Sequence, residues 1–262
     1  MIVDTNVSLS RWPFRRLPAD EPDKLVSVLR RRGIVQAWVG SFDGILHKDI
    51  TQVNARLAAD CRKYGKGMLV PFGSLNPTLP DWREDVRRCQ EEHHMPGIRL
   101  HPNYHGYNLR DPVFAEVLQT AVARRLCVQL AWCMEDVRTQ HPLVRVPNVD
   151  LAPLPGLLQR FPALRLQILN WKSARGAQAR QLTSAGQVCM DFAMVENPGG
   201  VARLLKTVPA ERVFFGSNFP LFYLESALLK VREAGLAPAE EEGVCGRNAR
   251  RFLERRTGPG AA

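Results

Sequence analysis

The sequence predicts a single barrel of eight parallel strands, each followed by a helix. Short apolar runs alternate with longer amphipathic segments from one end of the 262-residue chain to the other. Eight such units in about 250 residues match the usual size of a closed (β/α)8 barrel. Hydrophobic residues make up 45% of the chain, which is enough for a sizeable core. A doubly wound sheet is the second choice, because no glycine-rich phosphate-binding loop follows the first run.

Strands and helices are expected in strict alternation along the chain. The predicted strands are Met1–Val3, Gln36–Val39, Gly67–Phe72, Gly97–Leu100, Cys127–Leu130, Arg165–Leu169, Val188–Phe192 and Arg212–Phe215. The predicted helices are Asp23–Arg32, Ile50–Tyr64, Trp82–His93, Pro112–Arg124, Leu154–Phe161, Gly176–Ser184, Gly199–Thr207 and Glu225–Ala234.

No repeat, low-complexity tract or linker divides the chain, so we expect one barrel domain over residues 1–255. Residues 256–262 are small and rich in Gly and Pro, and we expect them to form a flexible tail. The segment Met134–Pro155 is rich in proline and has little helical pattern. It is therefore predicted to be a long loop after the fifth strand, lying over the mouth of the barrel.

Composition argues against membrane and nucleic-acid partners. The chain opens without a basic segment followed by an apolar run, and no apolar stretch approaches the roughly 20 residues that span a bilayer. We therefore expect a cytoplasmic protein. The net charge is +10, but the arginines are spread over many predicted helices and form no single stripe, so an anionic small substrate remains open. The six cysteines form no C-x-x-C pair and are expected to be reduced thiols.

Polar residues follow most of the predicted strands. In barrels of this kind the chemistry takes place at the C-terminal ends of the strands. The residues that follow the predicted strands are rich in Asn and Ser, which are also common in ordinary loops. They comprise Asp4–Ser8, Ser41–Asp43, Ser74–Asn76, His101–His105, Ala131–Cys133, Asn170–Lys172, the residues from Asp191 onward, and Gly216–Pro220.

Four segments resemble the amidohydrolase-related family, in the right order and over nearly the whole chain. Gly216–Pro220 is similar to the G-S-D-x-P ending of the family's last strand, and Val3–Ser8 resembles its opening D-x-H-x-H strand. Gly97–Tyr107 looks like the fourth-strand segment, and Val244–Leu253 is similar to the terminal helix. The resemblance implies a hydrolase barrel of the metal-dependent type.

The departures from the family pattern fall on its metal ligands. Two histidines of the first strand correspond here to Asn6 and Ser8. Histidines of the fifth and sixth strands correspond to Ala131 and Asn170, and the aspartate of the eighth corresponds to Asn218. Alanine donates nothing and a carboxamide is a poor, neutral ligand. We therefore expect no metal at the family site and no cofactor.

Asparagine in place of histidine or aspartate keeps hydrogen-bonding capacity but removes charge and metal affinity. One interpretation is an enzyme remnant adjusted for stability. The other is a rim rebuilt to bind a polyhydroxylated, sugar-like ligand, in which Asn6, Ser8, Asn170 and Asn218 would bind substrate.

The fourth strand carries the strongest candidates for catalysis. Strand alternation turns Ile98 and Leu100 toward the helices and directs Arg99 and His101 into the barrel. An arginine can hold an anion, and a histidine can exchange a proton near neutral pH. Asp191 alternates into an apolar strand and is a third candidate, as an inward-facing acid. The alternative is that Arg99 and His101 form a structural polar pair.

Further residues of the predicted rim could contact substrate. Tyr104 and His105 follow the fourth strand, His141 lies in the long loop, and Lys172 could supply a cation at the mouth. His101, His105 and His141 could instead form a relocated metal site.

The predicted function is a metal-independent, lactonase-like hydrolase acting on a small anionic or polyhydroxylated molecule, such as a lactone or a sugar acid. His101 would act as base or electrophile, and Arg99 and Lys172 would hold the developing oxyanion. The alternatives are a non-catalytic barrel that binds a sugar-like ligand or a partner, and a hydrolase with the relocated metal. The sequence is compatible with a homo-oligomer. It does not identify the substrate.

Overall fold

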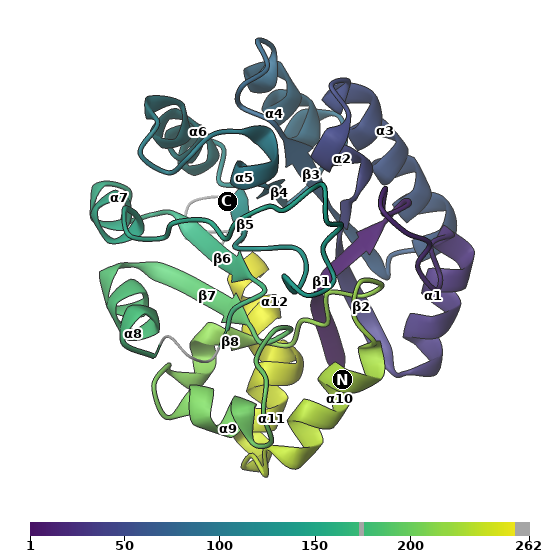
Figure 1. Cartoon of the computed structure of the whole chain (residues 1–262), viewed down its shortest axis with the longest axis vertical. Coiled ribbons are helices and arrows are strands. Elements are labelled where there is room, and N and C mark those ends of the chain that lie inside the picture. The colour runs from purple at the N-terminus through teal and green to yellow at the C-terminus, as the bar shows by residue number, and fades with distance from the viewer. Residues whose placement is uncertain (173–175, 255–262) are drawn as a thin grey trace, which may run out of the picture.

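Eight parallel strands form a barrel in the computed structural model, which describes residues 1–172 and 176–254 (Figure 1). The strands pair in chain order from first to last. The ring closes where Thr5 N donates to Phe215 O (2.9 Å) and Ser8 N donates to Phe219 O (3.0 Å). The strands are β1 (Ile2–Leu9), β2 (Ile34–Ser41), β3 (Leu69–Leu75), β4 (Gly97–Leu100), β5 (Cys127–Ala131), β6 (Arg165–Leu169), β7 (Gln187–Asp191) and β8 (Val213–Phe214).

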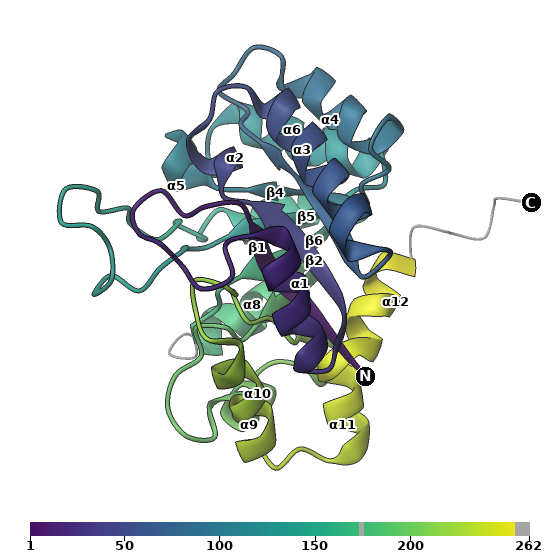
Figure 2. The same ribbon diagram turned by 90° about the vertical axis from the view of Figure 1, so that its right-hand side faces the viewer.

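Helices surround the barrel, and each predicted helix is present (Figures 1 and 2). Their ends lie within two residues of the prediction, except that the helix predicted over Ile50–Tyr64 ends at Asp60 and continues as a separate helical turn. The α-helices are α1 (Pro22–Arg31), α2 (Asp43–Leu46), α3 (Ile50–Asp60), α4 (Trp82–Glu91), α5 (Pro102–His105), α6 (Pro112–Ala123), α7 (Leu154–Arg160), α8 (Gly176–Ala185), α9 (Gly200–Leu205), α10 (Leu224–Glu233), α11 (Pro238–Glu242) and α12 (Asn248–Glu254). Shorter helical turns are η1 (Cys61–Gly65), η2 (Ala210–Arg212) and η3 (Gly243–Arg247).

The strand boundaries correct the prediction at the first three strands. Strand β1 runs on to Leu9, so Asp4–Ser8 lie within the strand and not after it. Ser41 and Ser74 likewise belong to β2 and β3. An apolar run marks a strand only while both of its faces meet apolar groups. Here the inward face of several strands is polar, so the apolar runs end before the strands do.

The interior of the barrel changes from apolar to polar along its axis. At the end covered by α12, aromatic side chains of Trp38, Phe72, Phe214 and Phe252 pack into a buried cluster. Outside the strands, Ile98 and Leu100 belong to the main core between the sheet and the helices. Toward the C-terminal ends of the strands, the interior is filled by hydrogen-bonded polar side chains.

These polar side chains form a chain of hydrogen bonds with a fixed direction, which we call the inner chain. Arg99 Nε donates to Gln129 Oε1 (2.9 Å), and Gln129 Nε2 donates to Gln167 Oε1 (2.9 Å). Gln167 Nε2 donates to Thr5 Oγ1 (2.7 Å), which donates to Phe215 O (3.0 Å). A guanidinium can only donate and a carbonyl can only accept, so the two ends fix the orientation of both glutamine amides.

Arg99 is a fully buried cation. Its Nη1 lies 2.9 Å from Val7 O and 3.3 Å from Ser8 Oγ, and its Nη2 lies 3.2 Å from Trp38 O. Within residues 1–172 and 176–254 no carboxylate lies within 4.0 Å of it. Burial lowers the pKa of Arg99 to about 10, which leaves it charged at neutral pH. Gly40 makes room for it, because a Cβ there would lie 2.6 Å from Nη1.

The predicted loop after the fifth strand is confirmed, since no helix or strand interrupts the chain between β5 and α7. The loop crosses the front of the barrel in Figure 1 and projects from the body in Figure 2. The predicted tail, residues 256–262, lies outside the described residues. None of the helices in the described part of the chain is long and apolar enough to cross a bilayer.

Replacing Arg99 by leucine is expected to lower the free energy of unfolding by about 3 kcal/mol or more. The substitution leaves buried acceptors on β1, β2 and β5 without a donor, at a cost of roughly 1–3 kcal/mol each. Urea unfolding followed by circular dichroism measures the change. The control Arg31→Leu, on the exposed side of α1, should cost less than about 0.5 kcal/mol. Equal effects of the two substitutions would contradict the role given to Arg99.

Candidate functional site at the barrel mouth

A second hydrogen-bond chain, the outer chain, lies at the C-terminal ends of the strands. Asn170 Nδ2 donates to Cys133 O (2.6 Å), and Asn170 Oδ1 accepts from Asn6 Nδ2 (2.8 Å). Asn6 Nδ2 also donates to Asp191 Oδ2 (2.9 Å). Because the backbone carbonyl of Cys133 can only accept, the orientation of both amides is fixed. Asn6 and Asn170 are buried and are bonded to each other.

The other positions that the resemblance assigns to metal ligands also contact protein. Asn218 Nδ2 donates to Met134 O (2.9 Å), which ties the end of β8 to the long loop. Ser8 Oγ accepts from Arg99, and Ala131 packs in an apolar cluster. Asn170 and Asn218 both have left-handed backbone conformations, with φ of 62° and 56°. Asparagine tolerates this conformation better than most residues, which gives both positions a structural reason for the amide.

Two buried carboxyl groups lie beside the outer chain. Asp191 accepts from the backbone N–H groups of Asn170 and Ala193, each 3.0 Å away. Asp4 accepts from the backbone N–H groups of Asn6 (3.1 Å) and Ser217 (3.0 Å), and its second oxygen is bonded to Ser217 Oγ. Burial raises the pKa of Asp191 to about 6 and the pKa of Asp4 to about 7, and these hydrogen bonds oppose the rise.

His101 is buried, and its Nδ1 has no hydrogen-bond partner in the described structure. It lines a small cavity with Tyr104, Ala131 and Cys133, where about 10 Å³ is open to the centre of a water molecule. That is space for about one water. Burial, helped by the charges of His105 and Arg99, lowers the pKa of His101 well below its usual value. The imidazole is therefore neutral at pH 7.

The relocated metal site that we considered for His101, His105 and His141 is not formed. His105 Nε2 donates to Gly44 O (2.9 Å), and its ring meets His101 edge-on. His141 is exposed and stacks on Phe14. The 251 residues at positions 1–172 and 176–254 contain no group of three His, Cys, Asp or Glu side chains that could hold a metal ion.

An apolar cluster, the mouth plug, covers the centre of the barrel mouth. The ring of Trp12 packs edge-on against Phe14, Phe42 and Tyr104. An ion pair between Arg15 and Glu135 joins the loop after β1 to the loop after β5. With the plug in place, Asn6, Asn170 and Asn218 are at most 2% exposed. The buried members of the plug are Trp12, Leu17, Phe42, Ile45, Ala131, Met134 and Leu221.

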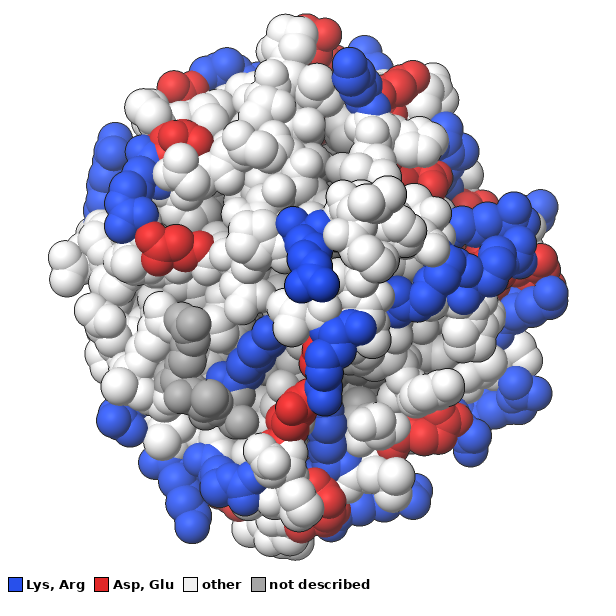
Figure 3. Space-filling model, viewed as in Figure 1, with Lys and Arg blue, Asp and Glu red and all other residues white. Residues whose placement is uncertain are grey.

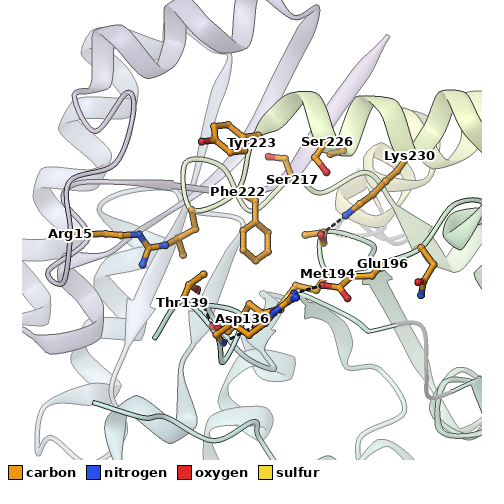
Figure 4. Close-up of a pocket in the computed structure, with 15 residues that line it drawn as sticks. Arg15, Asp136, Thr139, Met194, Glu196, Ser217, Phe222, Tyr223, Ser226 and Lys230 are labelled. Atoms are coloured by element: carbon orange, nitrogen blue, oxygen red, sulfur yellow. Dashed lines mark hydrogen bonds and ion pairs between the residues drawn. The ribbon is translucent and has the colours of Figure 1, made fainter. Parts of the chain in front are cut away.

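Beside the plug lies an open pocket of about 510 Å³, the side pocket, shown in Figure 4. It is bounded by α10 and by the loops that follow β1, β5, β7 and β8. Arg15, Arg138 and Lys230 reach it from three of these segments, and Met194 and Phe222 supply apolar surface. Basic side chains also gather over the centre of this face of the molecule (Figure 3).

The structure brings together only part of the predicted site. Asn6, Asn170 and Asp191 meet in the outer chain, whereas Arg99 belongs to the inner chain. Lys172 lies over the ring of Trp132, with Nζ 6.0 Å from the ring centroid. The catalytic and binding roles given to all these residues stay predictions.

Sequence reasoning missed the residues that fill or line the site. Gln129 and Gln167 stand at alternate positions in apolar strands, so the same alternation that located Arg99 could have located them. Nothing in the sequence singled out Arg138 or Lys230, because each is one of many basic residues in a loop or a helix.

The raised pKa of Asp4 predicts a protein that loses stability as the pH rises through about 7. The unfolded state ionises near pH 3.8, so the stabilisation is complete below that value and is lost on ionisation in the folded state. Between pH 5 and pH 8 the loss is expected to be about 2–3 kcal/mol. In Asp4→Asn the amide oxygen can keep the two backbone bonds while the NH2 donates to Ser217 Oγ.

Urea unfolding at pH 5 and pH 8 tests this prediction. Asp4→Asn should be more stable than the wild type at pH 8, with a smaller difference between the two pH values. Other titrating groups are shared by both proteins and cancel in the comparison. An unchanged pH dependence in the variant would contradict the prediction.

Comparison with known proteins places the chain in a family. It matches the family model described as amidohydrolase over residues 13–255, and no curated protein sequence matches it. Solved structures share the fold at low sequence identity. 5-Carboxyvanillate decarboxylase from Sphingomonas paucimobilis superposes with a TM-score of 0.78 at 13% identity, covering 97% of this chain and 98% of that one. 2,6-Dihydroxybenzoate decarboxylase from Rhizobium superposes with a TM-score of 0.76 at 12% identity, covering 97% of this chain and 100% of that one. Dihydroxybenzoic acid decarboxylase from Polaromonas sp. JS666, solved with bound manganese, superposes with a TM-score of 0.73 at 12% identity. The match covers 97% of this chain and 98% of that one. The family match covers most of the chain, and the chain therefore belongs to the amidohydrolase family.

Proposed function

We propose that this chain is an amidohydrolase-family barrel that binds a small organic anion at its mouth without using a catalytic metal ion. The outer chain carries the proposal, because Asn6 and Asn170 stand at positions matching family metal ligands and both side chains are bonded to protein. Asn6 Nδ2 donates to Asn170 Oδ1, and Asn170 Nδ2 donates to Cys133 O. The fold and a pocket at the mouth are retained, while the metal-binding groups are not. This combination favours binding over metal-assisted chemistry.

The residues at the family site do not fit a divalent cation such as the manganese of the Polaromonas enzyme. Such an ion requires several oxygen or nitrogen donors directed at one point. Here Asn170 Oδ1 faces an N–H group of Asn6, and Asn218 directs its NH2 group at Met134 O. Both oxygens of Asp191 accept N–H groups, and Ala131 has no donor atom.

Charge at the mouth supports an anionic ligand. The chain carries a net charge of +10, and Arg15, Arg138 and Lys230 line the side pocket. A cleft lined by cations raises the local concentration of anions. The decarboxylases with the same fold are named for aromatic acids, which are small organic anions. A sugar-like ligand is less well supported, since the asparagines that suggested it are buried and bonded to protein.

A metal-independent hydrolase acting on a lactone or a sugar acid is the second candidate. The unpartnered Nδ1 of His101 favours it, because a buried imidazole nitrogen without a partner is available to a water molecule in the adjoining cavity. This reaction requires the mouth plug to open. It also needs Arg99 to release a donor, although each of its nitrogens is already bonded to protein.

The protein is expected to bind no stoichiometric manganese or zinc. Calorimetric titration of either ion should give no saturable heat, because no set of metal-binding donors converges at the mouth among residues 1–172 and 176–254. Elemental analysis of protein dialysed against metal-containing buffer is the independent check. About one ion per chain that survives washing with a chelator would contradict the prediction.

His101→Ala separates the two candidate functions. If the protein only binds, the folded variant should bind organic acids as the wild type does, and neither should open aldonolactones. If His101 is a base, the wild type should open a lactone and the variant should lose at least about 100-fold in rate. Circular dichroism checks the fold, and Cys245→Ser, in the turn before the terminal helix, serves as a control that should change neither property.

A further inference from the structure

We infer that the side pocket takes a monocarboxylate with an apolar body, and that Lys230 binds the carboxylate. The inference rests on the proposed function, since it names the ligand class and the receptor within the anion-binding mouth. Lys230 extends from α10 into the pocket, with Nζ 2.7 Å from the backbone carbonyl of Ala193 (Figure 4).

Lys230 is a cation that still lacks a counter-ion. In the part of the chain that the structure describes, no carboxylate lies within 4.0 Å of its ammonium group, and one backbone carbonyl is its hydrogen-bond partner. An ammonium group has three N–H donors, so donors remain for a ligand. Partial burial lowers the pKa of Lys230, which reflects an ammonium group that has lost water without gaining a carboxylate.

The carboxylates whose negative charge acts on Lys230 are bonded to other groups. Asp191 belongs to the outer chain, and Glu196 is paired with Arg138. Glu233, on the same helix, accepts from the backbone N–H of Gly199. These acids influence Lys230 at a distance and leave the position beside Nζ open to an anion.

The other two cations of the pocket already have counter-ions. Arg138 is held by Asp136, at 2.7 Å, and by Glu196, at 3.1 Å. Arg15 is paired with Glu135, whose side chain is 2% exposed. A ligand carboxylate that approached either arginine would have to displace or share an existing partner, so Lys230 is the favoured receptor.

Apolar side chains form part of the pocket wall. Met194 and Leu221 are buried, Phe222 is half-buried, and its ring stands in the centre of the pocket in Figure 4. Ala193 and Ala227 add small apolar surface. The hydroxyl groups of a sugar acid would lose water against these apolar side chains, whereas a hydrocarbon body would gain from the contact.

Calorimetric titration with three probes tests the inference: cyclohexanecarboxylate, its neutral amide and gluconate. The wild type should bind cyclohexanecarboxylate roughly 10- to 100-fold more tightly than the amide, because a hydrogen bond to a charged group is lost with the amide. Gluconate should bind at least about tenfold more weakly than cyclohexanecarboxylate, because it gains nothing from the apolar side chains.

Lys230→Met keeps the apolar stem and removes the charge, and it should abolish the preference for the carboxylate over the amide. The matched control is Lys48, an exposed lysine outside the pocket, whose replacement by methionine should leave that preference within about threefold of the wild-type value. Circular dichroism confirms folding, and Lys230→Arg should keep a preference for the carboxylate.

The outcomes distinguish this inference from the proposed function. If the wild type binds none of the acids, both fail. If it binds acids but Lys230→Met keeps the preference for the carboxylate over the amide, the assignment of Lys230 is wrong and the proposed function stands. Gluconate binding as tight as that of cyclohexanecarboxylate would overturn the apolar body of the ligand.

Discussion

A guanidinium group at the centre of a barrel must give up its water, and the surrounding strands must replace every hydrogen bond that the water made. In this protein Arg99 donates to backbone carbonyls on β1 and β2 and to Gln129 on β5. That requirement orders the interior, because Gln129 must then present its NH2 group to Gln167. The inner chain runs from a cation to the carbonyl of Phe215, next to the seam where β8 meets β1.

The outer chain repeats this principle without a cation. Asn6 and Asn170 link the ends of β1 and β6, and Asp191 accepts at the end of β7. A metal ion at such a mouth would draw several strand ends together through ligand bonds. Here amide hydrogen bonds make those connections, and they need neither a divalent charge nor an open coordination position. The mouth plug then excludes water, which strengthens the buried hydrogen bonds and raises the pKa values of Asp4 and Asp191.

Closure of the central mouth moves the open space to one side. The side pocket lies where α10 and the loops after β5, β7 and β8 meet, and it combines apolar side chains with Lys230. The pocket and the outer chain share neighbours, since Ala193 bonds Asp191 through its N–H group and Lys230 through its carbonyl. Ala193 would therefore link a ligand bound at Lys230 to Asp191, the acid that terminates the outer chain.

The sequence by itself determined the eightfold alternation of strands and helices, the inward direction of Arg99 and the polar residue types at the strand ends. Each follows from residue type or from a period of two or 3.6 residues, which are local properties. Only the tertiary structure decided whether the asparagines face a ligand or one another, since Asn6 and its partner Asn170 are 164 residues apart. It also decided that a plug closes the mouth and that, in the described part of the chain, no carboxylate pairs with Lys230, because both depend on which loops meet in space. Local patterns fix the direction of a side chain, whereas its partners are fixed by the closure of the barrel.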